Sequence, residues 1–330
     1  MSGSISINTF KTPEEVLELD GVADSSGVGQ DNFSSLIGDY HFPGNCGSLK
    51  CCCLKKGGRL CGQDHRNGYV VELIDGKKSV LGSTCVKEFD SEGELRKSIS
   101  YYENAKIYEE RVRKINHIFY SKEDIISNLS EKKENLLDVY RYNSEFEKSI
   151  PASAFRKLND MARQGVDNVV VELVYIDEEV DEKTGKVERE ERVVPHTLGK
   201  LKGLKIFNKD YLESLISEFS EKINLLTGLE YTNRGETSKK VATLHRKLEE
   251  IDRMLSVANE FISDKFVFEN SDKKLLCFLS PSFEERSRLL RMWMLDSKTR
   301  GVNKSHAAES LRIMDDEIKK YHGAQEVRVP

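Results

Sequence analysis

Residues 41–89 read HFPGNCGSLKCCCLKKGGRLCGQDHRNGYVVELIDGKKSVLGSTCVKEF and hold six of the seven cysteines of this 330-residue chain. The apolar run 69–74, the turn signal Asp75-Gly76 and the apolar return 79–82 predict a β-hairpin. Clustered cysteines in a reducing compartment are metal ligands more often than disulfides. The stretch therefore predicts a small metal-stabilised β module over residues 45–90.

The spacing of the cysteines and of one histidine suggests a zinc site. Cys61 and His65 are separated by a short glycine-containing turn, and the hairpin returns the chain to Cys85. Structural zinc takes four sulfur or nitrogen ligands in a tetrahedron, so one further ligand is needed from the preceding cysteines. If residues 51–53 are extended, Cys51 and Cys53 share a face. We predict a Zn²⁺ site of Cys53, Cys61, His65 and Cys85, with Cys51 as the substitute, and the choice among Cys46, Cys51, Cys52 and Cys53 remains open.

The order of cysteine turn, β-hairpin and Gly82-Ser83-Thr84-Cys85 resembles a treble-clef or zinc-ribbon finger at the level of the superfamily. The resemblance covers residues 46–89. It implies a zinc ion that holds the module together and leaves no coordination position open for catalysis. The chain departs from the usual pattern because it has no Cys-x-x-Cys pair and a single cysteine in the second half of the motif.

Long helices are expected to follow the cysteine module. Apolar residues recur at alternating steps of four and three along 101–119 and again along 241–262, which is typical of a coiled coil or a long helical hairpin. The first stripe comprises Tyr101, Ala105, Tyr108, Val112, Ile115 and Phe119, and the second comprises Val241, Leu244, Leu248, Ile251, Leu255, Ala258 and Ile262. The two stripes could pack against each other.

The rest of the chain completes an α+β protein that is mainly helical. The apolar runs 169–176 and 187–194 predict a second β-hairpin, residues 265–269 have a strand-like pattern, and a capping box at Ser282 and Glu285 predicts a helix start. We expect six segments: an acidic, partly flexible segment (1–44), the zinc-finger module (45–90), a long helical or coiled-coil region (91–165), a β-hairpin insert (166–208), a helical region packing on the first coiled-coil segment (209–265) and a C-terminal helical region (266–330).

Charge is distributed unevenly, and this bears on the partner. The chain carries a net charge of −5, but residues 45–90 carry eight bases against five acids. Clustered Lys and Arg side chains contact nucleic-acid phosphates. The candidate contacts are Lys55, Lys56, Arg59, Arg66, Lys77 and Lys78. The sequence thus favours a zinc-binding protein that is associated with nucleic acid, DNA or RNA, or is regulatory, with a structural zinc ion and basic residues that contact the phosphate backbone.

Two other functions stay open. In the first, zinc folds the finger and the heptad helices bind a protein partner or a second copy of the chain, as in an adaptor or a self-assembling coiled-coil protein. In the second, the site is that of a metal-dependent nuclease, which is less favoured because no second histidine follows His65 within 30 residues. No sequence motif names an enzyme, so a non-enzymatic role is favoured. Without a long apolar run or a signal-peptide pattern, we expect a cytoplasmic protein.

Overall fold

The computed structural model describes residues 7–22, 26–44, 46–87, 89, 93–180, 187–296 and 304–330. The chain divides into two compact units. The first unit comprises Met1–Ile118 and Tyr231–Arg246, and the second comprises Phe119–Glu230 and Lys247–Pro330. Each unit is therefore built from segments that lie far apart in the sequence.

The first unit is organised around a four-stranded sheet with the order β1-β2-β5-β6. Its strands are β1 (Thr9–Phe10), β2 (Phe33–His41), β5 (Asn67–Leu73) and β6 (Lys78–Gly82). Strands β5 and β6 form the predicted hairpin, with Tyr69 opposite Leu81, and Gly76 adopts a φ of 80° in the connecting turn. This positive φ suits glycine, which has no side chain to clash with the backbone. The hairpin prediction is confirmed.

Short elements surround this sheet. They are helix α1 (Pro13–Leu17), capped by Thr12, the two-stranded ribbon of β3 (Leu49–Lys50) and β4 (Asp64–His65), and helix α2 (Ser83–Val86). Helix α3 (Glu94–Tyr120) begins next to the sheet, where the Tyr102 hydroxyl donates to Asp39 Oδ1 at 2.9 Å and Lys106 Nζ donates to Asp39 Oδ2 at 2.5 Å. The core of this unit includes the buried Cys51, Cys52, Cys53 and Cys85 beside aliphatic and aromatic side chains.

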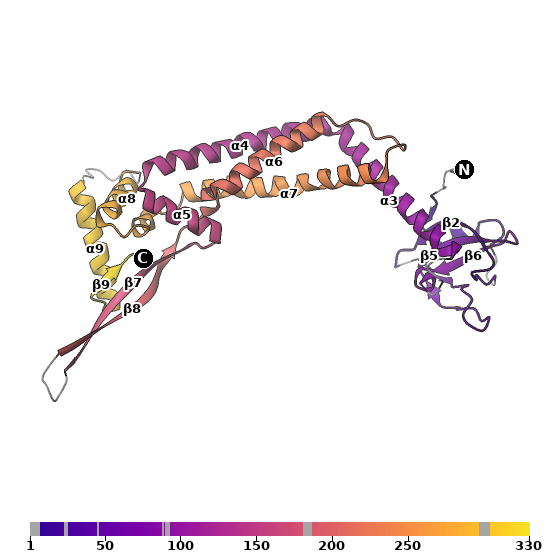
Figure 1. Ribbon diagram of the computed structural model, residues 1–330, viewed down its shortest axis with the longest axis horizontal. Coiled ribbons are helices and arrows are strands. Elements are labelled where there is room, and N and C mark those ends of the chain that lie inside the picture. Colours follow the sequence, from indigo (N-terminus) through magenta and orange to yellow (C-terminus); the bar gives the residue numbers. More distant parts are fainter. Residues whose placement is uncertain are drawn as a thin grey trace. The chain divides into compact units, whose positions relative to one another are not determined.

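The second unit is mainly helical (Figure 1). Helices α4, α6 and α7 lie side by side in it, with the Tyr211 ring of α6 stacked on Phe261 of α7. The helices are α4 (Lys122–Ser149), α5 (Ala152–Gln164), α6 (Lys209–Thr227), α7 (Ser238–Glu269, starting in the first unit), α8 (Phe283–Asp296) and α9 (Lys304–His322), with 3₁₀ turns η1 (Leu204–Phe207) and η2 (Lys273–Phe278). The prediction of a strand at residues 265–269 is wrong, because helix α7 continues through these residues and buries Phe268.

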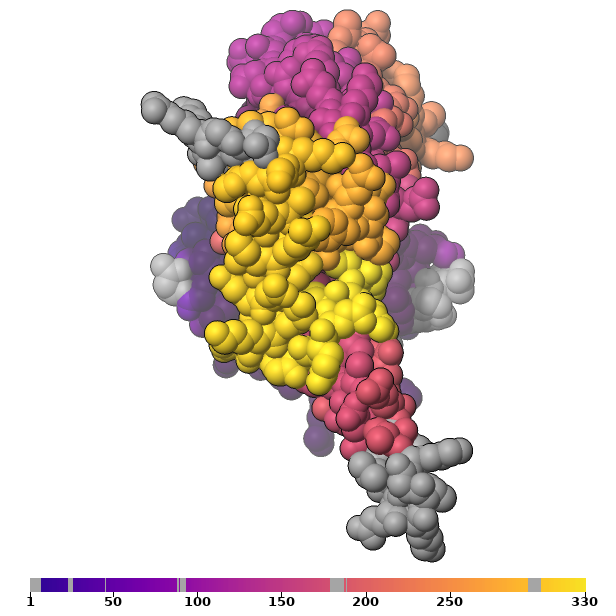
Figure 2. Space-filling model, turned by 90° about the vertical axis from the view of Figure 1, so that its left-hand side faces the viewer, coloured from indigo at the N-terminus to yellow at the C-terminus, as the bar shows by residue number. Residues whose placement is uncertain are grey.

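A second sheet with the order β8-β7-β9 belongs to the second unit. Strands β7 (Asn168–Val180) and β8 (Val187–Lys200) form the predicted second hairpin, and the short β9 (Glu326–Arg328) pairs antiparallel with β7. The base of the hairpin is buried at Val171 and Leu173, whereas Ile176 and Val187 are exposed farther out. In Figure 2, helix α9 and the C-terminal residues (yellow) lie next to this hairpin (pink).

The chain is thus an α+β protein dominated by helices, as the sequence predicts. The region expected to be long and helical or coiled-coil (91–165) contains α3, α4 and α5, and Ser121 separates the first two. The expected helix start at Ser282 is confirmed, because the Glu285 amide donates to Ser282 Oγ at 3.4 Å. Packing of the two heptad stripes as a coiled coil stays a prediction. Among the described residues, no helix combines the length and the apolar character needed to cross a membrane.

Candidate metal centre

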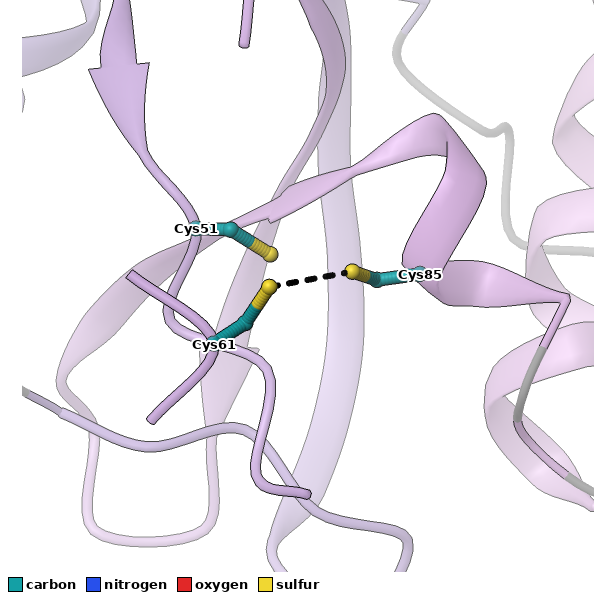
Figure 3. A group of neighbouring side chains, drawn as sticks. All are labelled: Cys51, Cys61 and Cys85. Carbon is teal, nitrogen blue, oxygen red and sulfur yellow. Dashed lines mark hydrogen bonds between the residues drawn. The ribbon is translucent and has the colours of Figure 1, made fainter. Parts of the chain in front are cut away.

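Three cysteine sulfurs converge in the first unit. The Sγ atoms of Cys51, Cys61 and Cys85 all lie within 4.8 Å of one another, and Cys61 and Cys85 are 3.5 Å apart (Figure 3). In a tetrahedral site with zinc–sulfur bonds of about 2.3 Å, two sulfur ligands lie about 3.8 Å apart. The spacing of these three sulfurs therefore fits a single metal ion.

The first two sulfurs meet because residues 51–54 fold back against residues 60–63. The Cys51 amide donates to Gln63 O at 2.9 Å, and the Cys61 amide donates to Cys53 O at 2.8 Å. The turn between these arms contains Gly57 and Gly58, whose φ angles of 94° and 76° favour glycine. The glycine pair of the sequence thus allows the reversal that brings Cys61 back to Cys51.

The third sulfur comes from helix α2, directly after strand β6. The Gly82 amide, at the end of β6, donates to Cys51 Sγ at 3.4 Å. The Cys52 amide donates to Val80 O at 3.0 Å, which ties the cysteine arm to the same strand. Because α2 starts at Ser83, its first turn carries Cys85 toward the other two sulfurs. The hairpin predicted from sequence therefore delivers Cys85 as expected.

The surroundings of the sulfurs affect their charge. A backbone hydrogen bond from Gln63 lowers the pKa of Cys61, and contacts with Cys85, Cys51 and Lys55 add to this effect against the opposing effect of burial. Burial raises the pKa of Cys85, as do its contacts with Cys51 and Cys61. The Lys55 Nζ lies 3.7 Å from Cys85 Sγ. Since metals bind the thiolate form, the Lys55 ammonium favours the charge state that a metal needs.

The structure brings together some, but not all, of the predicted ligands. Cys61 and Cys85 belong to the three-sulfur group, and the first position is taken by Cys51, the substitute, instead of Cys53. Cys53 is buried with its Sγ 3.8 Å from Leu54 O. The Cys61 amide donates to Cys53 O, and the amide of the next residue, Gly62, donates to Cys51 O, so two adjacent amides bond to carbonyls that are two residues apart. Gly62 has a φ of 64°. This irregular pairing breaks the simple alternation from which Cys53 was chosen.

His65, the predicted nitrogen ligand, lies outside the three-sulfur group. Its Nδ1 is 2.7 Å from the Tyr40 hydroxyl, and its ring stacks on Tyr40. Burial lowers the pKa of His65, although Asp64 opposes this effect. A Cβ atom placed on Gly82 would come within 3.0 Å of the His65 ring, so the imidazole packs beside the strand that also contacts Cys51. The spacing of the cysteines does not indicate that Gly82, Gln63 and Lys55 lie next to the sulfurs. These contacts depend on how the irregular turn folds back.

The predicted cationic residues fall on three segments. Lys55, Lys56 and Arg59 lie on the turn that joins the two arms of the sulfur group, and Lys56 and Arg59 are exposed. Arg66 is exposed after β4, whereas Lys77 pairs with Asp75 at 2.9 Å in the β5–β6 turn and Lys78 is half-buried. The densest positive charge is thus next to the sulfurs.

Three sulfur donors suit a soft or borderline ion such as zinc, and a tetrahedral ion would need one ligand more. Comparisons of the chain with profiles of protein families, with curated proteins and with solved structures found no match.

Proposed function

We propose that the first unit is a zinc-stabilised module that associates with nucleic acid. The observation that carries the proposal is the convergence of Cys51, Cys61 and Cys85 from three separate segments. A metal ion held by these sulfurs would cross-link both arms of the cysteine turn and helix α2, which otherwise meet in a small core. Structural zinc sites stabilise small domains in this way.

The cationic turn supports the second half of the proposal. Lys56 and Arg59 are exposed beside two glycines that leave the backbone open, since no atom lies within 4 Å of a Cβ placed on Gly57 or Gly58. In the described part of the chain, neither side chain lies within ion-pair distance of a carboxylate. Cations without a protein counter-ion are available to phosphate groups. Fixing the turn through the metal would hold these charges in place and reduce the entropy lost on binding.

Metal analysis of purified protein tests the site itself. We expect about one zinc ion per chain, lost in Cys51→Ser, Cys61→Ser and Cys85→Ser because each removes one of three sulfur ligands. Cys46→Ser is the matched control and should retain the ion. Cys53→Ser and His65→Gln distinguish the ligand set predicted from sequence from the three-sulfur group of the structure. Both substitutions should remove the ion if the predicted set binds it, and neither should if Cys51 takes the place of Cys53 and His65 is not a ligand. Zinc-free wild-type protein would contradict the proposal.

A salt series tests the nucleic-acid partner. The double variant Lys56→Glu, Arg59→Glu, which leaves Lys55 beside Cys85 in place, should bind duplex or single-stranded oligonucleotides at least tenfold more weakly at low salt, and its affinity should depend less steeply on salt. The matched control is Arg156→Glu, Lys157→Glu, which makes the same charge change at exposed positions of the second unit. Wild-type protein that binds no oligonucleotide at 50 mM salt would exclude this partner and favour an interaction with another protein.

A further inference from the structure

Two histidines from distant parts of the chain meet in the second unit. His196 lies on β8, opposite Val171 of β7, and His322 is the last residue of α9. Their ring centroids are 4.1 Å apart with an angle of 57° between the ring planes. Both side chains are half-buried. The two imidazoles are thus in direct contact between the sheet and the end of the helix.

The histidine contact lies at the point where the C-terminal strand begins. After His322, Gly323 turns the chain with a φ of 68°, and the Gln325 amide donates to Val174 O at 2.9 Å. Strand β9 then pairs with β7 through Leu173 opposite Val327. The Tyr175 hydroxyl donates to His322 O at 3.3 Å. Any force that separates the two rings therefore acts on the attachment of β9.

Among the described residues, no carboxylate lies within ion-pair distance of either imidazole. Charged and titratable groups on the surrounding elements include Glu172 and Tyr175 of β7, Glu191 and Arg192 of β8, Glu326 and Arg328 of β9, Asp316, Lys319, Lys320 and Tyr321 of α9, and Lys273 and Lys274 of η2. Glu191 and Glu326 are both taken up by Arg328, and Asp316 pairs with Lys319.

Protonation of both rings is therefore unfavourable in the closed arrangement. Burial lowers the pKa of His196, and a positive charge on His322 lowers it further. A histidine whose pKa is lowered in the folded state destabilises that state as the pH falls below the ordinary value of about 6.5.

We propose that His196 and His322 form an acid-sensitive latch for the C-terminal strand. At neutral pH the rings pack together and β9 stays on the edge of β7. Below about pH 6, charge on both rings drives them apart and releases Gly323–Arg328 from the sheet. This exposes the β7 edge between Glu172 and Val174, the only residues of β7 paired with β9 in the described register.

Hydrogen exchange of the peptide 323–330 at two pH values tests the latch. At pH 7.5, wild type and His196→Gln should exchange alike, because both carry uncharged side chains at this position. At pH 5.5 the wild type should exchange roughly fivefold faster than His196→Gln, as expected for a partly screened repulsion between neighbouring charges. Comparing proteins at one pH removes the intrinsic pH dependence of exchange.

Two further variants make the test decisive. His196→Lys carries a permanent charge at this position, so at pH 5.5, where His322 also gains a charge, it should exchange at least as fast as the wild type. His306→Gln, on the same helix but at its other end, is the matched control and should keep the wild-type response. Equal exchange of wild type and His196→Gln at pH 5.5, or loss of the response in His306→Gln, would overturn the latch.

A titration by NMR makes the test independent of the strand itself. In His322→Gln, the pKa of His196 should rise, because the neighbouring charge is gone. An unchanged pKa of His196 would show that the rings do not interact and would also overturn the proposal. Because neither measurement involves the cysteine group, the result is independent of the proposed function.

Discussion

The two compact units are stabilised in different ways. In the first unit, four buried cysteines, Cys51, Cys52, Cys53 and Cys85, share the core with aliphatic and aromatic side chains of the sheet such as Tyr40 and Val70. In the second, large aromatic rings fill the space between helices: Phe207 lies 4.8 Å from Phe268 and 5.3 Å from Phe146, measured between ring centroids. Apolar burial grows with side-chain size. We therefore expect a metal cross-link between the sulfurs to add to the stability of the first unit, whereas the second unit depends on packing alone.

Metal removal should give the largest difference between the units. Chelation is expected to abolish protection from hydrogen exchange over residues 49–87 while α4 and α6 stay protected, because structural zinc can contribute about 10 kcal/mol or more to a small domain. Hydrogen exchange read by mass spectrometry measures both regions in one sample. Retained protection over 49–87 in metal-free protein would show that packing alone holds the first unit.

Truncation of the aromatic cluster should affect the second unit alone. Phe207→Ala removes a fully buried ring that also contacts Phe155, and should lower the free energy of unfolding of this unit by about 3–5 kcal/mol. Urea unfolding followed by circular dichroism measures the change. Phe207→Leu, which leaves a smaller cavity, is the control and should cost clearly less. Loss of zinc from Phe207→Ala would contradict independent stabilisation of the two units.

A buried amide joins the two sequence segments of the first unit. Asn116 Nδ2 donates to Thr232 O at 3.0 Å, and the Thr232 amide donates to Asn116 Oδ1 at 2.8 Å. Asn116→Ala leaves both backbone groups without these partners and should lower the free energy of unfolding by about 2–3 kcal/mol. The hydrogen-exchange rate of the Thr232 amide should also increase in this variant. The exposed Asn128→Ala on α4 is the control, and an equal effect of both substitutions would exclude this role for Asn116.

The smallest expected effect concerns Asp39 and the docking of α3. Burial alone would raise the pKa of Asp39, but hydrogen bonds from Lys106, Thr9 and Tyr102 outweigh it, so that the pKa is lowered. The carboxylate therefore stabilises the fold above its ordinary pKa of about 3.9, and this stabilisation is lost as the pH falls through the lowered value.

Asp39→Asn should lower the free energy of unfolding by about 1 kcal/mol, which is typical of a partly exposed charged group with several hydrogen bonds. The difference in unfolding free energy between wild type and Asp39→Asn should be largest near pH 6 and shrink below pH 4. Taking the difference removes the protonation of the sulfurs, which is common to both proteins. The exposed Asp31→Asn serves as control, and a difference that does not change with pH would contradict the assignment.

Sequence patterns predicted those parts of the fold that depend on local periodicity and turns. Both β-hairpins and the start of α8 follow from apolar spacing, turn residues and a capping box. The strand expected at 265–269 fails for a physical reason. Lys265-Phe266-Val267-Phe268-Glu269 is rich in aromatic and β-branched residues, as strands are, but Phe261 and Phe268 are both buried and lie seven residues apart, two turns of helix α7. Packing decided between two patterns that the local sequence left equivalent.

The sequence by itself determined which segment carries the sulfur-rich site and that Cys61 and Cys85 come together across a turn and a hairpin. Only the tertiary structure placed Cys51 with them, because an irregular pairing at Gly62 changes which side chains share a face. It alone joined His196 to His322 and Asn116 to Thr232, which are more than 100 residues apart. Periodicity reports how a segment is built, whereas contacts between distant segments depend on how several faces pack at once.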